Sequence, residues 1–435
     1  MGGRNHRILI AATLVLLLAS IAGLAQEVAA PHPARDTAAS SQAMSTVVLV
    51  SLDGFRWDYL DWPEARNLRR LAARGVRAEG LIPAFPSKTF PCHYTLATGL
   101  YPGHHGIISN HMRTPALGTF DLHDRASVED PRWWGGEPIW VTAERAGLVT
   151  AAMFWPGTET AIRGVRPTYW HRFDAHFRYR KRVEQVLAWL DLEDAQRPRL
   201  ITLYFQDPND TSHASGPQAP ETRKAVREVD ARLEDLLEGI ARRKLNDRVN
   251  LVITSDHGMA EVSRDRVIVL DETIRFAPDE LVEQGAFVQI APNAGREKKI
   301  YQALQGLNPH LAVYRREAIP ARFHLAGSDH VAPIVAIPEV GWEAMTQRHL
   351  AHWKLAGDHG QDPADPRMHG IFVAAGPALR AGRVIERFES IEVYNLLAAL
   401  LGIAPAPNDG HPDALREILL EHAKPARASD PNAGR

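Results

Sequence analysis

Residues 46–54 have the sequence Thr-Val-Val-Leu-Val-Ser-Leu-Asp-Gly, an apolar run that ends in an acidic residue and a glycine. The run is short and rich in β-branched residues, which predicts a buried strand over Thr46–Leu52. Two further runs of the same kind predict buried strands over Leu200–Phe205 and Val249–Thr254. Polar or acidic residues follow each run, so three predicted strands end in side chains that can carry chemistry.

Predicted helices alternate with these strands. Residues 226–240 place apolar side chains three and four positions apart, which predicts an amphipathic helix. Residues 390–401 predict another helix, with Gly402 as its C-cap. Strands that alternate with helices indicate a doubly wound, mostly parallel α/β sheet flanked by helices. Ligands of such sheets bind beyond the carboxyl ends of the strands, so the polar residues there are the first candidates for a site.

The composition is that of an ordinary globular protein. The chain has 435 residues, of which 45% are hydrophobic and 23% charged, and it is long enough for one large domain or for a core plus a cap. The net charge of −2 argues against a nucleic-acid duplex or an anionic membrane as the main partner. The sequence also contains 20 histidines, a common ligand type for zinc and other transition metals.

The two ends of the chain differ from its middle. Residues 1–25 predict a signal peptide, with a basic start and an apolar run over Ile8–Ala22; an uncleaved membrane anchor is the alternative. Residues 26–45 predict a linker and residues 421–435 a disordered tail. Between them, 46–420 predicts one domain, in which the Pro-rich stretch at about 260–345 has few clear strands and is expected to form a small lobe. The expected product is a periplasmic or secreted monomer without a membrane span. The single Cys92 allows no intrachain disulfide, which is compatible with a periplasm.

Four acidic or histidine groups lie after predicted strands or in a later loop. Asp53 follows the first strand, Asn209 to His213 follow the second, and Asp256-His257 ends the third. Asp358-His359 lies in the later loop. Each group taken singly is more simply a turn or a surface pair. Together they are the ligand types that two Asp/His zinc sites require.

Thr89 is a candidate nucleophile. Pro91 suits the first turn of a helix that continues to Gly99, so Thr89 lies at its N-terminus, where free N–H groups favour anions. Position alone does not separate a plain N-cap from a hydroxyl that attacks phosphorus with the help of a metal.

Several longer motifs in the chain resemble those of a known protein family. These are Leu-Asp-Gly at 52–54, Phe-Pro-Ser-Lys-Thr-Phe-Pro at 85–91, the run His-Tyr-Thr-Leu-Ala-Thr-Gly-Leu-Tyr-Pro at 93–102, Ser-Asp-His-Gly-Met at 255–259, and His359-Gly360. In this order they resemble the nucleotide pyrophosphatase/phosphodiesterase family of the alkaline phosphatase superfamily. Residues 133–140 look like its bacterial members. The likeness covers about residues 46–410 and implies an alkaline-phosphatase-like fold with a small inserted lobe.

The resemblance also implies roles for single residues. It implies one Zn²⁺ held by Asp53, Asp256 and His257, with Thr89 bridging toward it. It implies a second Zn²⁺ held by Asn209, His213 and His359. Asn110 would hydrogen-bond a phosphate oxygen, and Phe90 and Tyr204 would sandwich a nucleobase, although Tyr204 also suits a core position at a strand end. The implied reaction cleaves nucleotide phosphodiester or pyrophosphate bonds through a phosphothreonine and releases a nucleoside monophosphate.

The chain departs from the family at Asn209, where the family has aspartate. An amide oxygen lacks the carboxylate's charge and is a poorer zinc ligand. Asp207 or Asp210 could substitute for it, or the second metal site could be weak. A weakly active or non-catalytic nucleotide-binding protein therefore stays an alternative. A phosphomonoesterase on the same scaffold is a second one. It would need an added positive group for the doubly charged phosphate, and Lys88 next to Thr89 could serve but lies outside the expected phosphate pocket.

Overall fold

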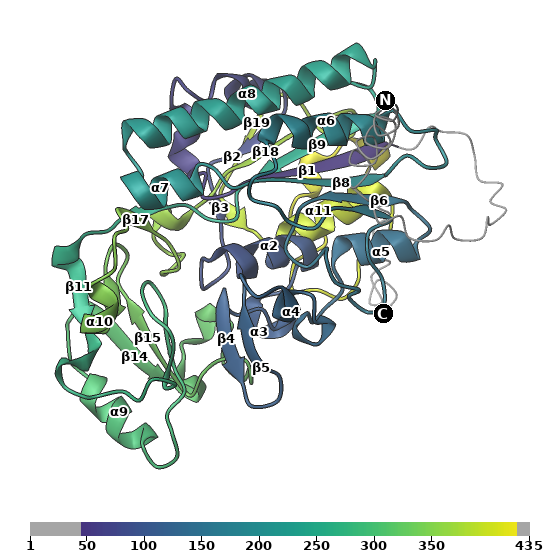
Figure 1. Ribbon diagram of the computed structural model, residues 1–435. Coiled ribbons are helices and arrows are strands. Elements are labelled where there is room, and N and C mark those ends of the chain that lie inside the picture. Colours follow the sequence, from purple (N-terminus) through teal and green to yellow (C-terminus); the bar gives the residue numbers. More distant parts are fainter. Residues whose placement is uncertain (1–44, 424–435) are drawn as a thin grey trace, which may run out of the picture.

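The computed structural model describes residues 45–423. The predicted signal peptide, the predicted linker up to residue 44 and the predicted tail from residue 424 lie outside this range. The centre of the molecule is an eight-stranded sheet (Figure 1). Its strands follow the order β19 (Arg383–Ile385), β2 (Val76–Ala78), β18 (Phe372–Ala375), β9 (Val249–Thr254), β1 (Thr46–Leu52), β8 (Leu200–Phe205), β6 (Thr150–Met153) and β7 (Tyr169–Trp170).

Most neighbours in this sheet run parallel, as the sequence predicts. β1 lies between β8 and β9 and is parallel to both, and β6 is parallel to β8 and β7. β18 is the antiparallel member, paired with both β9 and β2. The carboxyl ends of β1, β8 and β9 therefore meet at one edge of the sheet.

Helices cover both faces of the sheet (Figure 1). One face carries α1 (Arg66–Arg74), α6 (Tyr179–Leu190) and α8 (Pro220–Arg242). The other carries α2 (Thr89–Thr98), α5 (Ile139–Arg145) and α11 (Glu392–Leu401). Successive side chains of a strand point to opposite faces, and β1 is buried throughout because both of its faces are covered. Val48 and Val50 belong to the hydrophobic core that packs against α1, α6 and α8. Val47 and Leu49 belong to the core that packs against α2, α5 and α11.

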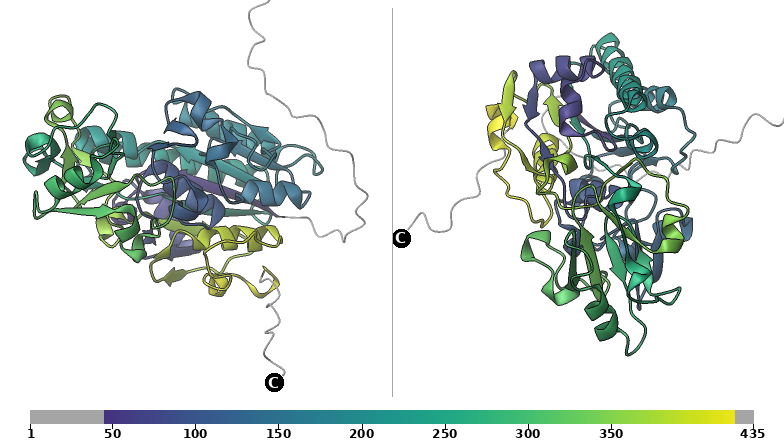
Figure 2. Two further views of the ribbon diagram at one scale, coloured as in Figure 1. Left: turned by 90° about the horizontal axis from the view of Figure 1, so that it is seen from below. Right: turned by 90° about the vertical axis from the view of Figure 1, so that its left-hand side faces the viewer.

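The stretch predicted to form a lobe has a sheet of its own. β12 (Leu281–Glu283), β13 (Val288–Ile290), β15 (Ile334–Pro338) and β14 (Leu311–Arg315) pair antiparallel in that order. α9 (Glu297–Leu304) packs with them around a separate hydrophobic cluster. Figures 1 and 2 show this lobe beside the larger domain. The expectation of few strands here was wrong, because strands of three to five residues give too short a pattern to read.

Short elements complete the fold and frame the edge where the strands end. α7 (Asn209–Ser215) follows β8, and β17 (Gly357–Asp358) pairs with β10 (Ala260–Glu261) just after β9. The others are β11 (Val267–Val269), β16 (Glu343–Met345), β3 (Leu81–Ile82), β20 (Phe388–Glu389), β4 (His111–Thr114), β5 (Gly118–Asp121), α3 (Pro102–His105), α4 (Arg125–Val128) and α10 (Gln347–Leu350). Within residues 45–423, no helix has the length and apolar character needed to cross a bilayer.

Candidate active site

Asp53, Asp256 and His257 form a first cluster at the carboxyl ends of β1 and β9. All three are almost completely buried. His257 Nε2 lies 3.5 Å from Asp53 Oδ1 and 3.0 Å from Asp256 Oδ2. The Gly54 backbone N–H donates to Asp256 Oδ1 at 3.1 Å and fixes its other oxygen toward the cluster. Three of the predicted ligand residues are therefore brought together around one point.

Within residues 45–423, neither Asp53 nor Asp256 has a lysine or arginine as an ion-pair partner. Asp53 Oδ1 and Asp256 Oδ2 are buried and have no hydrogen-bond donor among residues 45–423. Burial raises the pKa of Asp53 well above its usual range, and the nearby Asp256 carboxylate raises it further. Two buried carboxylates with orphaned oxygens are costly unless a cation neutralises them. The donor set therefore fits a bound divalent metal.

His213 and His359 form a second cluster, and Asn209 lies one helical turn before His213 in α7. His213 Nε2 and His359 Nε2 face each other at 3.1 Å. Asn209 is buried, and its Oδ1 has no donor partner in the described part of the chain. Its backbone N–H donates to the Asp53 carbonyl oxygen at 3.0 Å, which ties the start of α7 to the first cluster.

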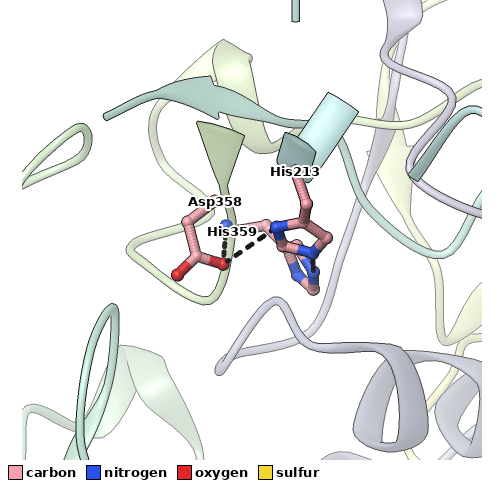
Figure 3. Close-up of side chains that lie close together, drawn as sticks. All are labelled: His213, Asp358 and His359. Atoms are coloured by element: carbon pink, nitrogen blue, oxygen red, sulfur yellow. Dashed lines mark hydrogen bonds and ion pairs between the residues drawn. The ribbon is translucent and has the colours of Figure 1, made fainter. Parts of the chain in front are cut away.

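The hydrogen bonds of the Nδ1 atoms indicate where these three histidines carry a proton. The Nδ1 atoms of His213, His257 and His359 each lie 2.8 Å from a backbone carbonyl oxygen, of Gly357, Gly258 and Ser87 respectively. A carbonyl oxygen can only accept, so each Nδ1 carries a proton, and each ring in its neutral form presents a lone pair at Nε2. Burial opposes protonation of His257, but the Asp256 carboxylate outweighs it and raises the pKa of His257. Facing lone pairs repel unless a cation lies between them, which is the usual arrangement of metal-binding histidines. Figure 3 shows the His213 and His359 rings with these edges together.

The two clusters are adjacent. The rings of His257 and His359 stack with centroids 3.5 Å apart and planes at 16°. One imidazole belongs to each predicted ligand set, so this pair joins the two candidate metal sites. The structure thus brings together all six predicted side-chain ligands other than Thr89.

The two aspartates considered as replacements for Asn209 are engaged elsewhere. Asp207 accepts hydrogen bonds from the Tyr179 hydroxyl at 3.0 Å and the Thr211 hydroxyl at 2.7 Å. Asp210 Oδ1 accepts the Asn209 side-chain amide N–H at 3.3 Å. The amide group of Asn209 thus donates to Asp210, and its Oδ1 lies beside Gly54, the residue after Asp53.

Thr89 is the first residue of α2, and Lys88 precedes it in extended conformation. Thr89 Oγ1 lies 3.4 Å from His257 Nε2, so the hydroxyl borders the first cluster. Asn110 Oδ1 accepts the Phe90 backbone N–H at 3.0 Å, which leaves the Asn110 amino group to donate elsewhere. A hydroxyl at a helix N-terminus, with an amide donor beside it, is suited to hold an anion such as a phosphate.

His93 lies in the site although the sequence reasoning missed it. Its Nδ1 donates to the Thr89 carbonyl oxygen at 2.8 Å and lies 3.2 Å from Asp256 Oδ2. Its Nε2 is paired with Ser51 Oγ at 2.8 Å, so neither ring nitrogen is available as a ligand. His93 instead orients Asp256 and the first turn of α2. His93 comes four residues after Thr89, which places both on one face of the helix. This spacing is the one feature of the sequence that could have pointed to His93.

The aromatic residues near Thr89 differ in exposure. Phe90 is half-buried beside Phe120 and Trp134. Tyr204 is only 9% exposed, and its hydroxyl donates to Asp53 Oδ2 at 2.6 Å. Phe173 packs edge-on to Tyr204 at 6.1 Å and is 39% exposed. Tyr204 therefore supports Asp53, and Phe173 offers the more open ring face.

Comparison with known proteins agrees with this geometry. Residues 47–362 match the sequence profile of the family described as type I phosphodiesterase/nucleotide pyrophosphatase. Human ectonucleotide pyrophosphatase/phosphodiesterase family member 7 is 38% identical over 399 residues, which cover 87% of this chain and 85% of that protein. Venom phosphodiesterase CdcPDE of Crotalus durissus collilineatus is 36% identical, over 86% of this chain and 46% of the venom protein.

Solved structures show the same fold. Murine ectonucleotide pyrophosphatase/phosphodiesterase 5 superimposes with a TM-score of 0.82 at 36% identity, covering 86% of this chain and all of that one. An inactive variant of that protein with a threonine-to-alanine substitution, in complex with AMP, matches with a TM-score of 0.82 at 35% identity, over 87% of this chain and all of that one. The predicted alkaline-phosphatase-like α/β fold is confirmed, whereas the bacterial affiliation stays a prediction, since these relatives are eukaryotic. The chain belongs to the type I phosphodiesterase/nucleotide pyrophosphatase family of enzymes.

Proposed function

We propose that this enzyme hydrolyses phosphodiester or pyrophosphate bonds of nucleotides with two Zn²⁺ ions and with Thr89 as the nucleophile, releasing a nucleoside monophosphate. The observation that carries the proposal is the position of Thr89 Oγ1 at a helix N-terminus, 3.4 Å from His257 Nε2. Around that point, buried carboxylate oxygens lack donors. A nucleophile, an anion-binding helix end and a cation site thus coincide.

The chain offers two ligand sets for the ions. Asp53, Asp256 and His257, with Thr89 at the border, would hold one zinc, and Asn209, His213 and His359 would hold the other. A bound zinc lowers the pKa of a hydroxyl or a water molecule by several units and supplies the nucleophile at neutral pH. The nitrogen and carboxylate donors suit zinc better than magnesium or calcium, which prefer all-oxygen sites.

The reaction proceeds in two displacements. In the first, Thr89 Oγ forms a bond to phosphorus while the bond to the leaving oxygen breaks, and a phosphothreonine results. In the second, a water oxygen attacks the same phosphorus, the Thr89 Oγ–phosphorus bond breaks, and the nucleoside monophosphate leaves. The Asn110 amino group donates to a non-bridging phosphate oxygen, and the Thr89 N–H together with the positive end of the α2 dipole stabilises the charge that builds up there.

A nucleotide base suits the surface beside Thr89. Phe90 is half-buried and Phe173 exposes a ring, so these two aromatics provide stacking surfaces on the substrate side. Tyr204 was expected in this role, and we propose Phe173 in its place because the hydroxyl of Tyr204 is bound to Asp53. The AMP complex of the murine relative supports a nucleotide as ligand.

The phosphomonoesterase alternative loses its main support. Lys88 Nζ lies 3.0 Å from Glu283 Oε1 in a buried ion pair, so its charge is committed to the lobe. An amide donor such as Asn110 suits the single charge of a diester better than the double charge of a monoester.

A comparison of two substrates tests the proposal. A chromogenic thymidine 5′-monophosphate diester and a chromogenic phosphomonoester are assayed as purified, after chelation, and after zinc is restored. We expect diester turnover that chelation removes and zinc restores, and no turnover by Thr89→Ala at unchanged zinc content. No turnover of either substrate with saturating zinc would indicate the nucleotide-binding alternative, and preference for the monoester would overturn the substrate class.

The export prediction is tested separately. We propose that the full-length chain is periplasmic or secreted, on the strength of residues 1–25. Cell fractionation of the tagged chain, followed by mass measurement of its N-terminus, would detect it outside the cytoplasm and shortened. An unshortened chain in the membrane fraction would indicate an anchor instead.

A further inference from the structure

The second ligand set contains no carboxylate. The first set has two, Asp53 and Asp256, whereas Asn209, His213 and His359 are all neutral when they present lone pairs. A divalent cation bound only to neutral groups in a buried site keeps its full charge, which is unfavourable in a low-dielectric environment. The chain therefore needs a negative charge near the second set if that site is to hold a metal.

Asp358 is the carboxylate that lies there. Its Oδ1 lies 3.7 Å from His213 Nδ1 and accepts the His359 backbone N–H at 2.8 Å. The residue is 9% exposed, and with His213 and His359 it forms a compact group of possible ligand residues. Figure 3 shows its carboxylate on the Nδ1 side of the His213 ring, whereas the Nε2 edge faces His359.

We infer that Asp358 supplies the negative charge that Asn209 does not, and that it acts through the His213 ring as a positioning residue for the second metal. His213 Nδ1–H donates to the Gly357 carbonyl oxygen, and Asp358 Oδ1 lies close behind the same edge. A carboxylate near the Nδ1–H of a histidine raises the basicity of Nε2 and strengthens its bond to a metal. The inference rests on the proposed two-metal function.

Neither a lysine nor an arginine forms an ion pair with Asp358 in the described part of the chain. A second acid, Glu343, hydrogen-bonds the Asp358 side chain, and burial together with the Asp358 carboxylate raises the pKa of Glu343 well above its usual range, which favours protonated Glu343 as the donor. Lys88 interacts electrostatically with Asp358, but its ammonium group forms its ion pair with Glu283, at 3.0 Å. His213 is the one ion-pair partner of Asp358 within residues 45–423. Asp207 and Asp210, the other acidic residues near α7, are engaged by Tyr179, Thr211 and Asn209.

A mutant cycle read out by metal affinity tests the inference. Zinc stoichiometry and the two dissociation constants are measured on the full chain by competition with a chromogenic chelator, for the wild type, Asp358→Asn, Asn209→Asp and the double variant. We expect Asp358→Asn to weaken the weaker zinc about 10- to 100-fold and to leave the tighter one unchanged. In the Asn209→Asp background, the same substitution should cost less than about threefold, because the second site then has its own carboxylate.

Two further variants separate the possible failures. Asp362→Asn changes an acid in the same loop that is paired with Arg322, and should leave both affinities unchanged. His213→Ala should abolish the weaker zinc; if it abolishes neither ion, the two-metal proposal itself fails and this inference fails with it. If His213→Ala removes one zinc but Asp358→Asn shifts neither affinity, or shifts it equally in both backgrounds, only the role of Asp358 is overturned. Urea unfolding in chelator confirms that each variant is folded.

Discussion

His105 lies outside the proposed metal ligand sets, and its burial makes the stability of the fold depend on pH. It is fully buried, its Nε2–H donates to Thr95 Oγ1 at 3.0 Å, and its Nδ1 accepts the Ile107 N–H at 3.2 Å, so the ring is neutral. The titratable groups that act on it are two other histidines, His104 and His330, and no carboxylate compensates its charge. Burial lowers its pKa from 6.5 to about 3.

The sign and size of the effect follow from that shift. Because the folded pKa lies below the unfolded one, the unfolded chain binds the extra proton between about pH 6.5 and pH 3, and acid destabilises the fold there. Each pH unit below 6.5 costs about 1.4 kcal/mol, so going from pH 7 to pH 5 costs about 2 kcal/mol through His105 alone.

Urea unfolding of wild type and His105→Gln at pH 7 and pH 5 measures this contribution. Chelator is present throughout, so that pH-dependent metal binding does not contribute. All other titrating groups are common to both proteins and cancel when the two pH dependences are subtracted. We expect the variant to lose about 2 kcal/mol less than the wild type on acidification. Equal losses, within about 0.5 kcal/mol, would refute a buried neutral His105.

Three further substitutions probe the site and its support. Tyr204→Phe removes the hydrogen bond to Asp53 and should lower the free energy of unfolding in chelator by about 1.5–3 kcal/mol; an unchanged urea midpoint would contradict it. Phe173→Ala should raise KM for the thymidine diester about fivefold at constant kcat and leave a methyl diester unaffected, whereas equal effects on both substrates would argue against stacking. Glu283→Gln leaves the buried Lys88 without its counter-ion and should cost about 3–5 kcal/mol in urea unfolding; a cost below about 1 kcal/mol would show that the pair does not tie the lobe to the core.

The sequence predicts the central strands well because both faces of each are covered. β1, β8 and β9 have the predicted bounds, since an unbroken apolar run is a strong signal for a strand buried on both sides. The helix predicted over residues 226–240 is the apolar part of the longer α8. The antiparallel β18 and the lobe strands carry no such signal, because short strands depend on neighbours distant in the chain.

The site residues likewise fall into those whose position the sequence predicts and those whose contacts it does not. Asp53, Asp256 and His257 directly follow the predicted strands, so their convergence follows from the sheet order. The hydroxyl of Tyr204 on Asp53, the His93 contact with Asp256 and the approach of Asp358 to His213 depend on rotamers and on loops that pack from elsewhere. A sequence pattern predicts which strand end a residue occupies, but not which neighbour its side chain meets.

The central place of β1 has a consequence for the order in which this protein can fold. β1 is synthesised early, yet both strands that flank it come from residues 200–205 and 249–254. An apolar segment whose partner strands are synthesised much later stays exposed and is prone to non-native association. Parallel pairing between segments far apart in the chain is also slow. A ribosome-bound chain that stops short of residue 249 holds Thr89 but lacks one flank of the sheet. Thr89, the proposed nucleophile, is thus translated long before the strand ends that surround it in the folded protein.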